Sequence, residues 1–205
     1  MPTSDTGADG AGIIATATNG AYCSGEGMVF DGDDDYVDVT TWSFGGAVTE
    51  EAYFNTNQND GDRIFQFFNS DSNNNGLYAY VPEGQVGLQS RYDPATRTIF
   101  SDGLVLGSWT HVVFTVDSSG TLTLYVDNGS AVSSCGGSSC ISISTLQREA
   151  HFIGNAPWAS RNFDGTIAYL RFWHGEALDA SQVAELYAAR IDPTPAPTGT
   201  VAPTP

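Results

Sequence analysis

The chain has 205 residues and a formal net charge of −17, from 24 acidic side chains against seven arginines and no lysine. Binding to a phosphate backbone requires a basic surface, so this charge argues against nucleic acid as a partner. Three interpretations stay open: bound calcium, a cationic partner, or solubility through a hydrated acidic surface. The sequence has no run of 18 apolar residues, so it predicts no membrane-spanning helix.

The N-terminal region predicts little ordered structure. Residues 1–11 are small and polar and are expected to be disordered. The run from Ile13 to Thr18 is expected to form an edge strand. No basic stretch followed by an apolar one marks a signal peptide. Cys23 is either a buried apolar residue, the interpretation we favour, or an exposed reactive thiol.

A cluster of carboxylates lies between positions 31 and 35, beside the turn residue Gly32. The turn begins with a Phe-Asp-Gly motif at Phe30, and a second such motif begins at Phe163. Calcium prefers carboxylate and carbonyl oxygens, so the two motifs together predict a calcium site. The candidate ligands are Asp31, Asp33, Asp34 and Asp164. An EF-hand loop starting at the first of them needs glutamate at its twelfth position, where Trp42 stands. The alternative is that these residues only form turns by bonding their own backbone.

A candidate sugar-binding surface follows in the middle of the chain. Tyr78 and Tyr80 alternate with apolar residues, so they share one face of a strand and can stack on a sugar ring. Gln89 and Arg91 share a face of the next strand and offer hydrogen bonds, and Trp158 falls in a loop where we expect exposure. The alternative is that a two-sided sheet buries both tyrosines.

Two alternating apolar runs predict a β-hairpin with its turn at residues 117–120. The runs are Val112, Phe114, Val116 and Leu122, Leu124, Val126. Further on, Cys135 and Cys140 flank a Gly-Gly-Ser-Ser loop that allows them to form a disulfide, and two reduced thiols are the alternative. Asn128 begins a glycosylation sequon, which is consistent with secretion.

The last part of the chain predicts a long strand and then one short helix. Residues 167–173 alternate, with one face expected to carry Ile167, Tyr169, Arg171 and Trp173. Asp179 can cap a helix over about 180–189, with Gln182 as its capping-box partner. The residues expected to dock this helix are Val183, Leu186 and Tyr187. Residues 191–205 are rich in proline and threonine and predict a semi-rigid linker to a further module.

Several of these segments together resemble a laminin-G-like domain of the concanavalin-A-like lectin and glucanase superfamily. The resemblance covers about residues 26–190 and is most specific in four motifs. These are Trp-Thr-His-Val-Val from Trp109, Tyr-Val-Asp-Asn-Gly from Tyr125, Phe-Ile-Gly-Asn from Phe152 and Phe-Asp-Gly-Thr-Ile from Phe163. It implies an all-β, two-sheet antiparallel jelly-roll sandwich over residues 12–190, with one short C-terminal helix.

The resemblance has further implications for particular residues. Met28 to Val39 looks like the opening strand of the family. The first and last strands of such domains are commonly neighbours, so Asp31 and Asp164 are expected to come together. Trp109 and Trp173 occupy framework positions and are expected to pack in the core.

The sequence does not favour a catalytic function. Glucanases of this fold class carry carboxylates at i, i+2 and i+4 on one strand, whereas Glu50 and Glu51 are each followed at those positions by uncharged residues. Related lyases use tyrosine, histidine, arginine and glutamine. Those residue types exist as Tyr80, His111, Arg91 and Gln89, but without the lyase motifs. We interpret His111 as a structural histidine, hydrogen-bonded inside the sandwich.

The sequence therefore favours a non-catalytic extracellular or cell-surface binding module. The leading hypothesis is calcium-dependent carbohydrate recognition or adhesion by a monomeric module of a larger protein. The alternative is a domain that binds an extracellular protein or acts as a structural spacer, and a polysaccharide-degrading enzyme is a third hypothesis.

Overall fold

The computed structural model describes residues 13–69, 75–92, 95–127, 131, 133–134, 142–155 and 161–193. Several predictions lie outside these residues and concern the N-terminal segment 1–11, the linker beyond residue 193, Trp158, the sequon at Asn128 and the bond between Cys135 and Cys140. Within the described part of the chain, no helix is long and apolar enough to cross a membrane.

Two seven-stranded sheets form the molecule, and the strands pair in antiparallel fashion throughout both. The sheet that we call the open sheet has the order β1 (Ala15–Thr18), β4 (Tyr36–Val39), β15 (Ala150–Ile153), β7 (Asp62–Phe68), β8 (Gly76–Val81), β9 (Gln85–Tyr92) and β10 (Ala95–Asp102).

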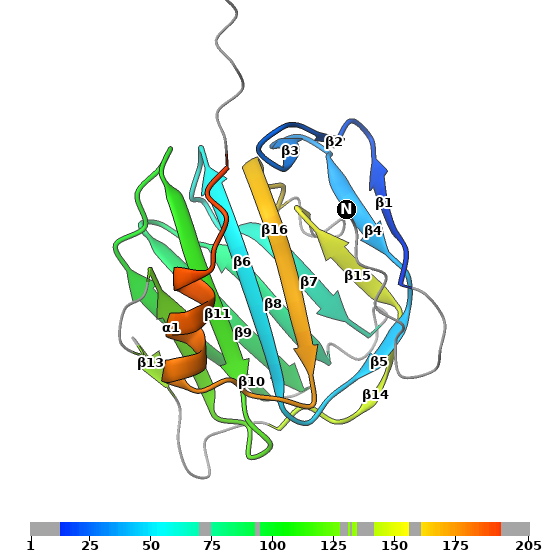
Figure 1. The fold of residues 1–205 in the computed structure, drawn as a ribbon. Helices are drawn as coiled ribbons and strands as arrows, with labels where there is room; N and C mark the ends of the chain where they lie inside the picture. The colour runs from blue at the N-terminus through cyan, green and yellow to red at the C-terminus, as the bar shows by residue number, and fades with distance from the viewer. Residues whose placement is uncertain are drawn as a thin grey trace, which may run out of the picture.

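The second sheet, the helix sheet, has the order β13 (Ser133–Ser134), β12 (Leu122–Val126), β11 (Trp109–Val116), β6 (Val48–Thr56), β16 (Asp164–His174), β3 (Met28–Asp31) and β2 (Tyr22–Cys23). A small ribbon of β14 (Leu146–Arg148) and β5 (Trp42–Phe44) lies at one end. The two sheets stack face to face (Figure 1), which confirms the predicted jelly-roll sandwich.

The core fills the space between the sheets. Alternation places one face of each strand inward, so that Phe54 of the helix sheet and Phe65 and Leu88 of the open sheet are fully buried in one apolar cluster. The predicted hairpin is β11 and β12, whose inward apolar residues belong to this cluster or pack against it. Gly154 packs against this core with a φ of 83°, and a Cβ there would lie 2.3 Å from the Phe30 ring.

The single opening strand expected from Met28 to Val39 is instead two strands. β3 belongs to the helix sheet and β4 to the open sheet, and the acidic turn crosses between them. β3 then pairs with β16, so that Asp31 and Asp164 are directly opposed across the ladder. The first strand, β1, is an edge strand as expected. Cys23 is exposed and unbonded, so the preferred interpretation of a buried cysteine was wrong.

The prediction for β16 was partly wrong, because its register with β6 shifts between Ile167 and Tyr169. The extra residue of such a bulge turns the following side chains to the opposite face. Ile167 therefore belongs to the core cluster, whereas Trp173 packs in a separate apolar cluster beneath the helix.

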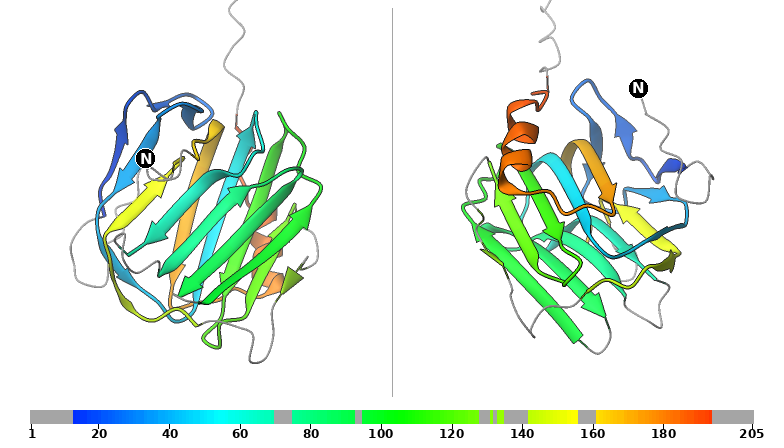
Figure 2. Two further views of the ribbon diagram at one scale, coloured as in Figure 1. Left: turned by 180° about the vertical axis from the view of Figure 1, so that it is seen from behind. Right: turned by 60° about the horizontal axis from the view of Figure 1, so that its bottom comes forward.

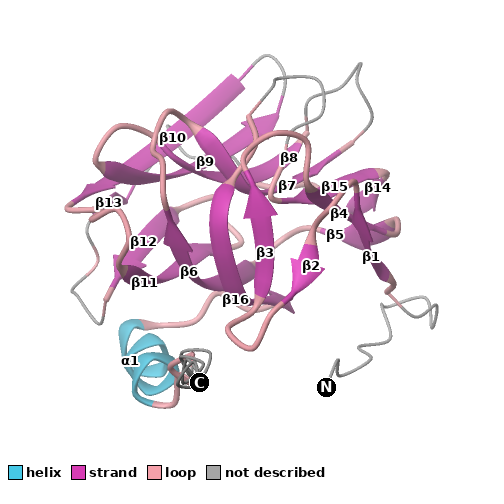
Figure 3. Cartoon of the chain, turned by 90° about the horizontal axis from the view of Figure 1, so that it is seen from above, coloured by secondary structure: helices cyan, strands magenta, loops and turns pink. Residues whose placement is uncertain are grey.

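The helix α1 (Ala180–Ala188) covers the outer face of the helix sheet (Figures 1 and 3). Asp179 caps it and forms the predicted capping box with Gln182. Val183 is buried against Val113 and Tyr125. Trp109 also lies on this outer face, where its ring is 5.2 Å from that of Tyr53. Neither Trp109 nor Trp173 therefore packs between the sheets as expected, because both stand on the outward register of their strands.

Candidate functional site

The first candidate site is the outer face of the open sheet. On β8, Leu77 and Ala79 point into the core and are fully buried. Tyr78 and Tyr80 alternate with them along the strand and therefore point outward. Figure 2 shows this sheet from behind, with no helix laid across the described strands. The tyrosine rings are 5.3 Å apart, and Tyr80 is more exposed than Tyr78, which is almost fully buried.

Arg63 joins these tyrosines from the neighbouring strand β7. Its guanidinium carbon lies 3.8 Å from the centre of the Tyr78 ring and 5.2 Å from that of Tyr80. Such contacts hold a cation over the aromatic faces. Burial raises the pKa of Tyr78, and it raises the pKa of Tyr80 to about 12. Both hydroxyls therefore remain neutral hydrogen-bonding groups at physiological pH.

Polar groups surround the tyrosines on the same face. Gln89 is the register partner of Tyr78, and its side-chain amide donates to the Thr98 hydroxyl at 2.8 Å. Arg91 lies two residues further along β9, on the same side. Gln66 of β7 is the other register partner of Tyr78, and its buried Nε2 has no hydrogen-bond partner among the described residues. The structure thus brings together the four predicted residues that it describes.

Arg63 and Gln66 were missed in the sequence. Strict alternation along β7 assigns these two residues to opposite faces of the strand, since they are three positions apart. A register shift between Arg63 and Phe65 places both beside the tyrosines of β8. The sequence shows Arg63 three positions before Gln66, but it gives no sign of the bulge that brings both side chains to one face.

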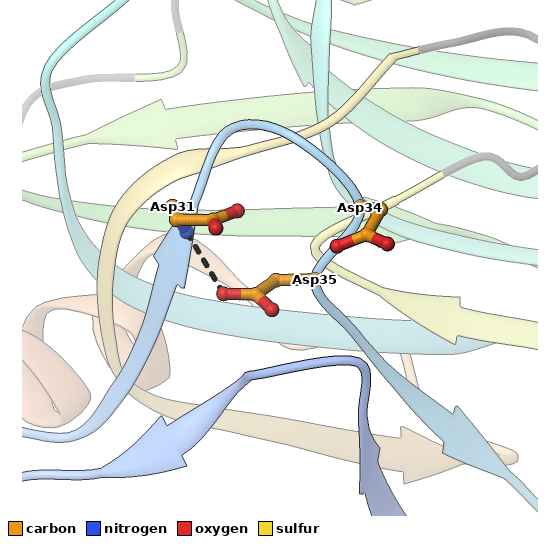
Figure 4. A group of neighbouring side chains, drawn as sticks. All are labelled: Asp31, Asp34 and Asp35. Atoms are coloured by element: carbon orange, nitrogen blue, oxygen red, sulfur yellow. Dashed lines mark hydrogen bonds between the residues drawn. The ribbon is translucent and has the colours of Figure 1, made fainter.

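The second candidate site is the acidic turn between β3 and β4. Carboxylate oxygens of Asp31, Asp34 and Asp35 all lie within 4.8 Å of one another (Figure 4). Calcium holds its oxygen ligands at 2.3 to 2.6 Å, so oxygens up to about 5 Å apart can share one ion. The three carboxylates are therefore close enough to contact one cation.

Asp35 is the buried member of this cluster. One of its oxygens accepts the Asp31 backbone N–H at 3.0 Å, and the other, Oδ1, has no partner among the described residues. Burial raises the pKa of Asp35, as do the neighbouring charges of Asp31 and Asp34. The sequence prediction selected Asp33 instead, although Asp35 alternates with the inward-facing Val37 of β4.

The other two predicted ligands lie beside the cluster. Asp33 is exposed, and its backbone N–H donates to Asp31 Oδ1 at 2.9 Å. Asp164 is opposed to Asp31, but its Oδ1 accepts a hydrogen bond from the Asn57 side chain at 2.8 Å. The geometry joins Asp164 to the loop after β6 and does not include it in the group of three.

A second pair of carboxylates lies where this loop meets β7, on Asp60 and on Asp62, the first residue of that strand. Asp62 is buried beside Asp60, and burial and this neighbour raise the pKa of Asp62 to about 7. Gln58 donates to the Asn162 carbonyl at 3.1 Å, and Arg161 donates to the Asp60 carbonyl at 2.6 Å. The loops after β3, β6 and β15 therefore meet at one end of the sandwich.

The residues considered for catalysis do not converge. Tyr80, Gln89 and Arg91 lie on the outer face of the open sheet, whereas His111 is buried on the outer face of the helix sheet. Its Nε2 contacts Glu51 Oε1 at 2.8 Å, beneath the ring of Tyr187. His111 is hydrogen-bonded as predicted, but it lies under the helix and not between the sheets.

Comparison with solved structures places this fold among jelly-roll domains of low sequence identity. The receptor-binding domain of botulinum neurotoxin mosaic serotype C/D has a TM-score of 0.68 and 10% identity over 88% of this chain and 47% of that one. Domain 4 of an extracellular arabinanase from Geobacillus stearothermophilus, in complex with arabinotriose, has a TM-score of 0.63 and 21% identity over 86% and 88%.

A carbohydrate-binding module of the Ruminococcus gnavus sialidase, bound to α2,3-sialyllactose, has a TM-score of 0.60 and 13% identity over 70% of this chain and 83% of that one. The chain spans about half the length of the neurotoxin binding domains that it matches, 47% of the first. No curated protein matches it.

The two packed antiparallel sheets define the class as a jelly-roll domain. A family model matches residues 31–184, three quarters of the chain. The chain belongs to that family, the concanavalin A-like lectin/glucanases superfamily.

Proposed function

We propose that the chain is a non-catalytic carbohydrate-recognition module that binds glycans on the outer face of the open sheet. The observation that supports this most directly is the pair of Tyr78 and Tyr80, with Arg63 against their rings, on a face that no described helix covers. Aromatic faces stack on the apolar side of a sugar ring, and amides and guanidinium groups bond its hydroxyls.

The solved structures add support of a limited kind. Two of the domains with a similar fold are complexes with an arabino-oligosaccharide and with sialyllactose. These likenesses establish the fold alone, and the proposal for this chain depends on its own side chains. The non-catalytic role is supported by β6, where Glu50 and Glu51 face opposite sides of the strand and neither is followed by a second carboxylate on its own face.

We also propose that calcium binds at the acidic turn. The three clustered carboxylates and the buried, unpartnered Oδ1 of Asp35 support this proposal. A cation there offsets the repulsion between these charges and fixes the crossing from β3 to β4. In this proposal the module works at the cell surface or outside the cell, as one monomeric part of a larger protein, where free calcium is abundant.

The glycan proposal is tested by binding to a glycan array, followed by titration calorimetry with the bound oligosaccharide. Tyr80→Ala is expected to weaken binding at least tenfold, because it removes the more exposed stacking surface. Tyr22→Ala is the matched control, since Tyr22 is 58% exposed on β2 of the other sheet.

Equal affinities of the two variants would contradict the proposed face. Absence of binding to every glycan would favour the alternative function, a protein-binding or spacer domain. Circular dichroism on both variants confirms that each retains the fold.

A further inference from the structure

Three of the seven arginines of this chain gather around Tyr78, although the net charge is −17. Arg63 lies against the ring, and the positive charges of Arg91 and Arg161 also act on the Tyr78 hydroxyl. Arg161 comes from the loop before β16, and its backbone carbonyl accepts the Arg63 N–H at 3.1 Å. Arg161 also bonds the Asp60 carbonyl and its charge acts on the Asp62 carboxylate, so the positive charge on the tyrosine face comes from Arg63 and Arg91.

None of these three arginines forms an ion pair within the described part of the chain. The arginine ion pairs found there join Arg171 to Glu51 and Arg190 to Asp192. Arg63 instead donates to the uncharged oxygens of Gln66 and Gly61, each at 3.4 Å. The Nε of Arg91 is buried without a hydrogen-bond partner.

This arrangement is costly in the absence of a ligand. Burial lowers the pKa of Arg63, so its charge is held partly dehydrated without a neighbouring carboxylate to offset the cost. Gln66 adds a second unsatisfied donor, since its buried Nε2 has no partner. Arg63 and Arg91 are both partly exposed and present only donors beside the tyrosine rings, whereas Gln66 Nε2 is buried out of the reach of a ligand. A ligand that completes the site must supply acceptors, and a negative charge suits it best.

We infer that the outer-face site selects sugars that carry a carboxylate, such as sialic or uronic acids, and this inference rests on the proposed glycan-binding function. The planar guanidinium groups of Arg63 and Arg91 match the two oxygens of a carboxylate. Tyr80 supplies the stacking surface for the sugar ring, and Gln89 bonds a hydroxyl group. A neutral sugar uses the stacking surface but leaves the positive groups unpaired.

Two matched pairs of oligosaccharides test the inference by titration calorimetry at physiological salt. One pair is α2,3-sialyllactose and lactose, and the other is trigalacturonic acid and its methyl ester. The wild-type chain is expected to bind the acidic member of at least one pair ten times or more tightly than the neutral member. The responding pair identifies the source of the carboxylate.

Arg91→Gln is expected to weaken binding of that acidic sugar about tenfold and to leave its neutral partner unchanged. The matched control is Arg190→Gln, which removes the same charge from the far side of the molecule, after α1.

Equal affinity for acidic and neutral members, with both lost in Tyr80→Ala, would overturn the inference and leave the glycan site in place. Preference for the acid that Arg91→Gln and Arg190→Gln reduce equally would also overturn it, because general charge and not the site would then be responsible. Absence of binding to all four probes, together with a blank glycan array, would overturn both this inference and the proposed function.

Discussion

Arg148 donates hydrogen bonds to both oxygens of Asn75, 73 residues away in the sequence. Its Nε donates to the backbone carbonyl at 3.0 Å, and its Nη2 donates to the side-chain Oδ1 at 3.1 Å. The carbonyls of Phe44 and Ser144 accept from the same guanidinium group, which is fully buried. One side chain thus connects β5, the segment before β8 and the segment before β14.

Arg148→Met is therefore expected to destabilise the domain by about 3 to 5 kcal/mol, because it leaves several buried carbonyls without a donor. Arg148→Lys retains the charge, but a single ammonium group cannot reach oxygens on three segments. We expect it to lose most of the same stability. Urea denaturation of both variants measures the effect, and a lysine variant as stable as the wild type would show that charge alone is important.

Glu50 and Glu51 provide a matched pair on opposite faces of β6. Burial raises the pKa of Glu50 well above its ordinary value, although the Arg148 charge opposes this. Glu51 lies 2.8 Å from the His111 Nε2 and forms an ion pair with Arg171 at 2.6 Å.

Glu50→Gln removes a carboxyl group whose charged form is disfavoured by burial, and it is expected to change the free energy of unfolding by less than about 1 kcal/mol. Glu51→Gln removes the charge that contacts two other side chains, and we expect a loss of about 3 kcal/mol. Denaturation curves at pH 7 compare the two, and the reverse order would refute the assignment of charge.

His151 predicts a pH dependence of stability. Its Nδ1 accepts a hydrogen bond from the Trp42 indole, and its Nε2 donates to the Arg148 carbonyl, so the ring is neutral. Burial lowers its pKa from 6.5 to about 4. At a pH between these two pKa values, His151 is protonated in the unfolded chain but stays neutral in the folded chain. The stability is therefore present above pH 6.5 and is lost as the pH falls toward 4.

The loss amounts to about 3 kcal/mol by pH 4, since each pKa unit corresponds to about 1.4 kcal/mol. His151→Gln removes the titration, so the difference in stability between wild type and variant should shrink by that amount from pH 7 to pH 4. Other acid-sensitive groups cancel in this difference. A constant difference over the range would show that His151 does not remain neutral in the fold.

Much of the fold could be predicted because its signals are local. Alternation marked the β11 and β12 hairpin, and the sequence from Asp179 to Gln182 marked the start of α1. Some of the errors came from single-residue shifts that leave no trace in composition. The bulge between Ile167 and Tyr169 reversed the expected face of half a strand.

In the candidate sites, too, local patterns predicted some residues and only the three-dimensional structure revealed the others. Tyr78, Tyr80, Gln89 and Arg91 could be placed on one face because each pair follows the two-residue period within its own strand. Arg63 could not be assigned to them, because its contact with Tyr78 depends on a bulge and on strand order. The inward turn of Asp35 could have been predicted from its alternation with Val37 and Val39, which are both buried.

The calcium proposal makes the last prediction. Calcium at a hundredfold excess over its dissociation constant stabilises a folded site by about 2.7 kcal/mol. For a domain of this size we expect a rise in melting temperature of about 5 to 10 °C, reversed by chelator. Sodium chloride at equal ionic strength serves as the comparison, because it screens charges without occupying a site.

Asp34→Asn is the most direct variant, because the Asp34 carboxylate makes no hydrogen bond among the described residues, whereas those of Asp31 and Asp35 each accept one. In chelator, this variant is expected to melt at or slightly above the wild-type temperature, since one repulsive charge is gone. In calcium it should melt several degrees below. Asp38→Asn, an exposed change on β4 outside the cluster, should respond to calcium as the wild type does. If Asp34→Asn kept the full calcium response, the ion would bind elsewhere and the acidic turn would be only a turn.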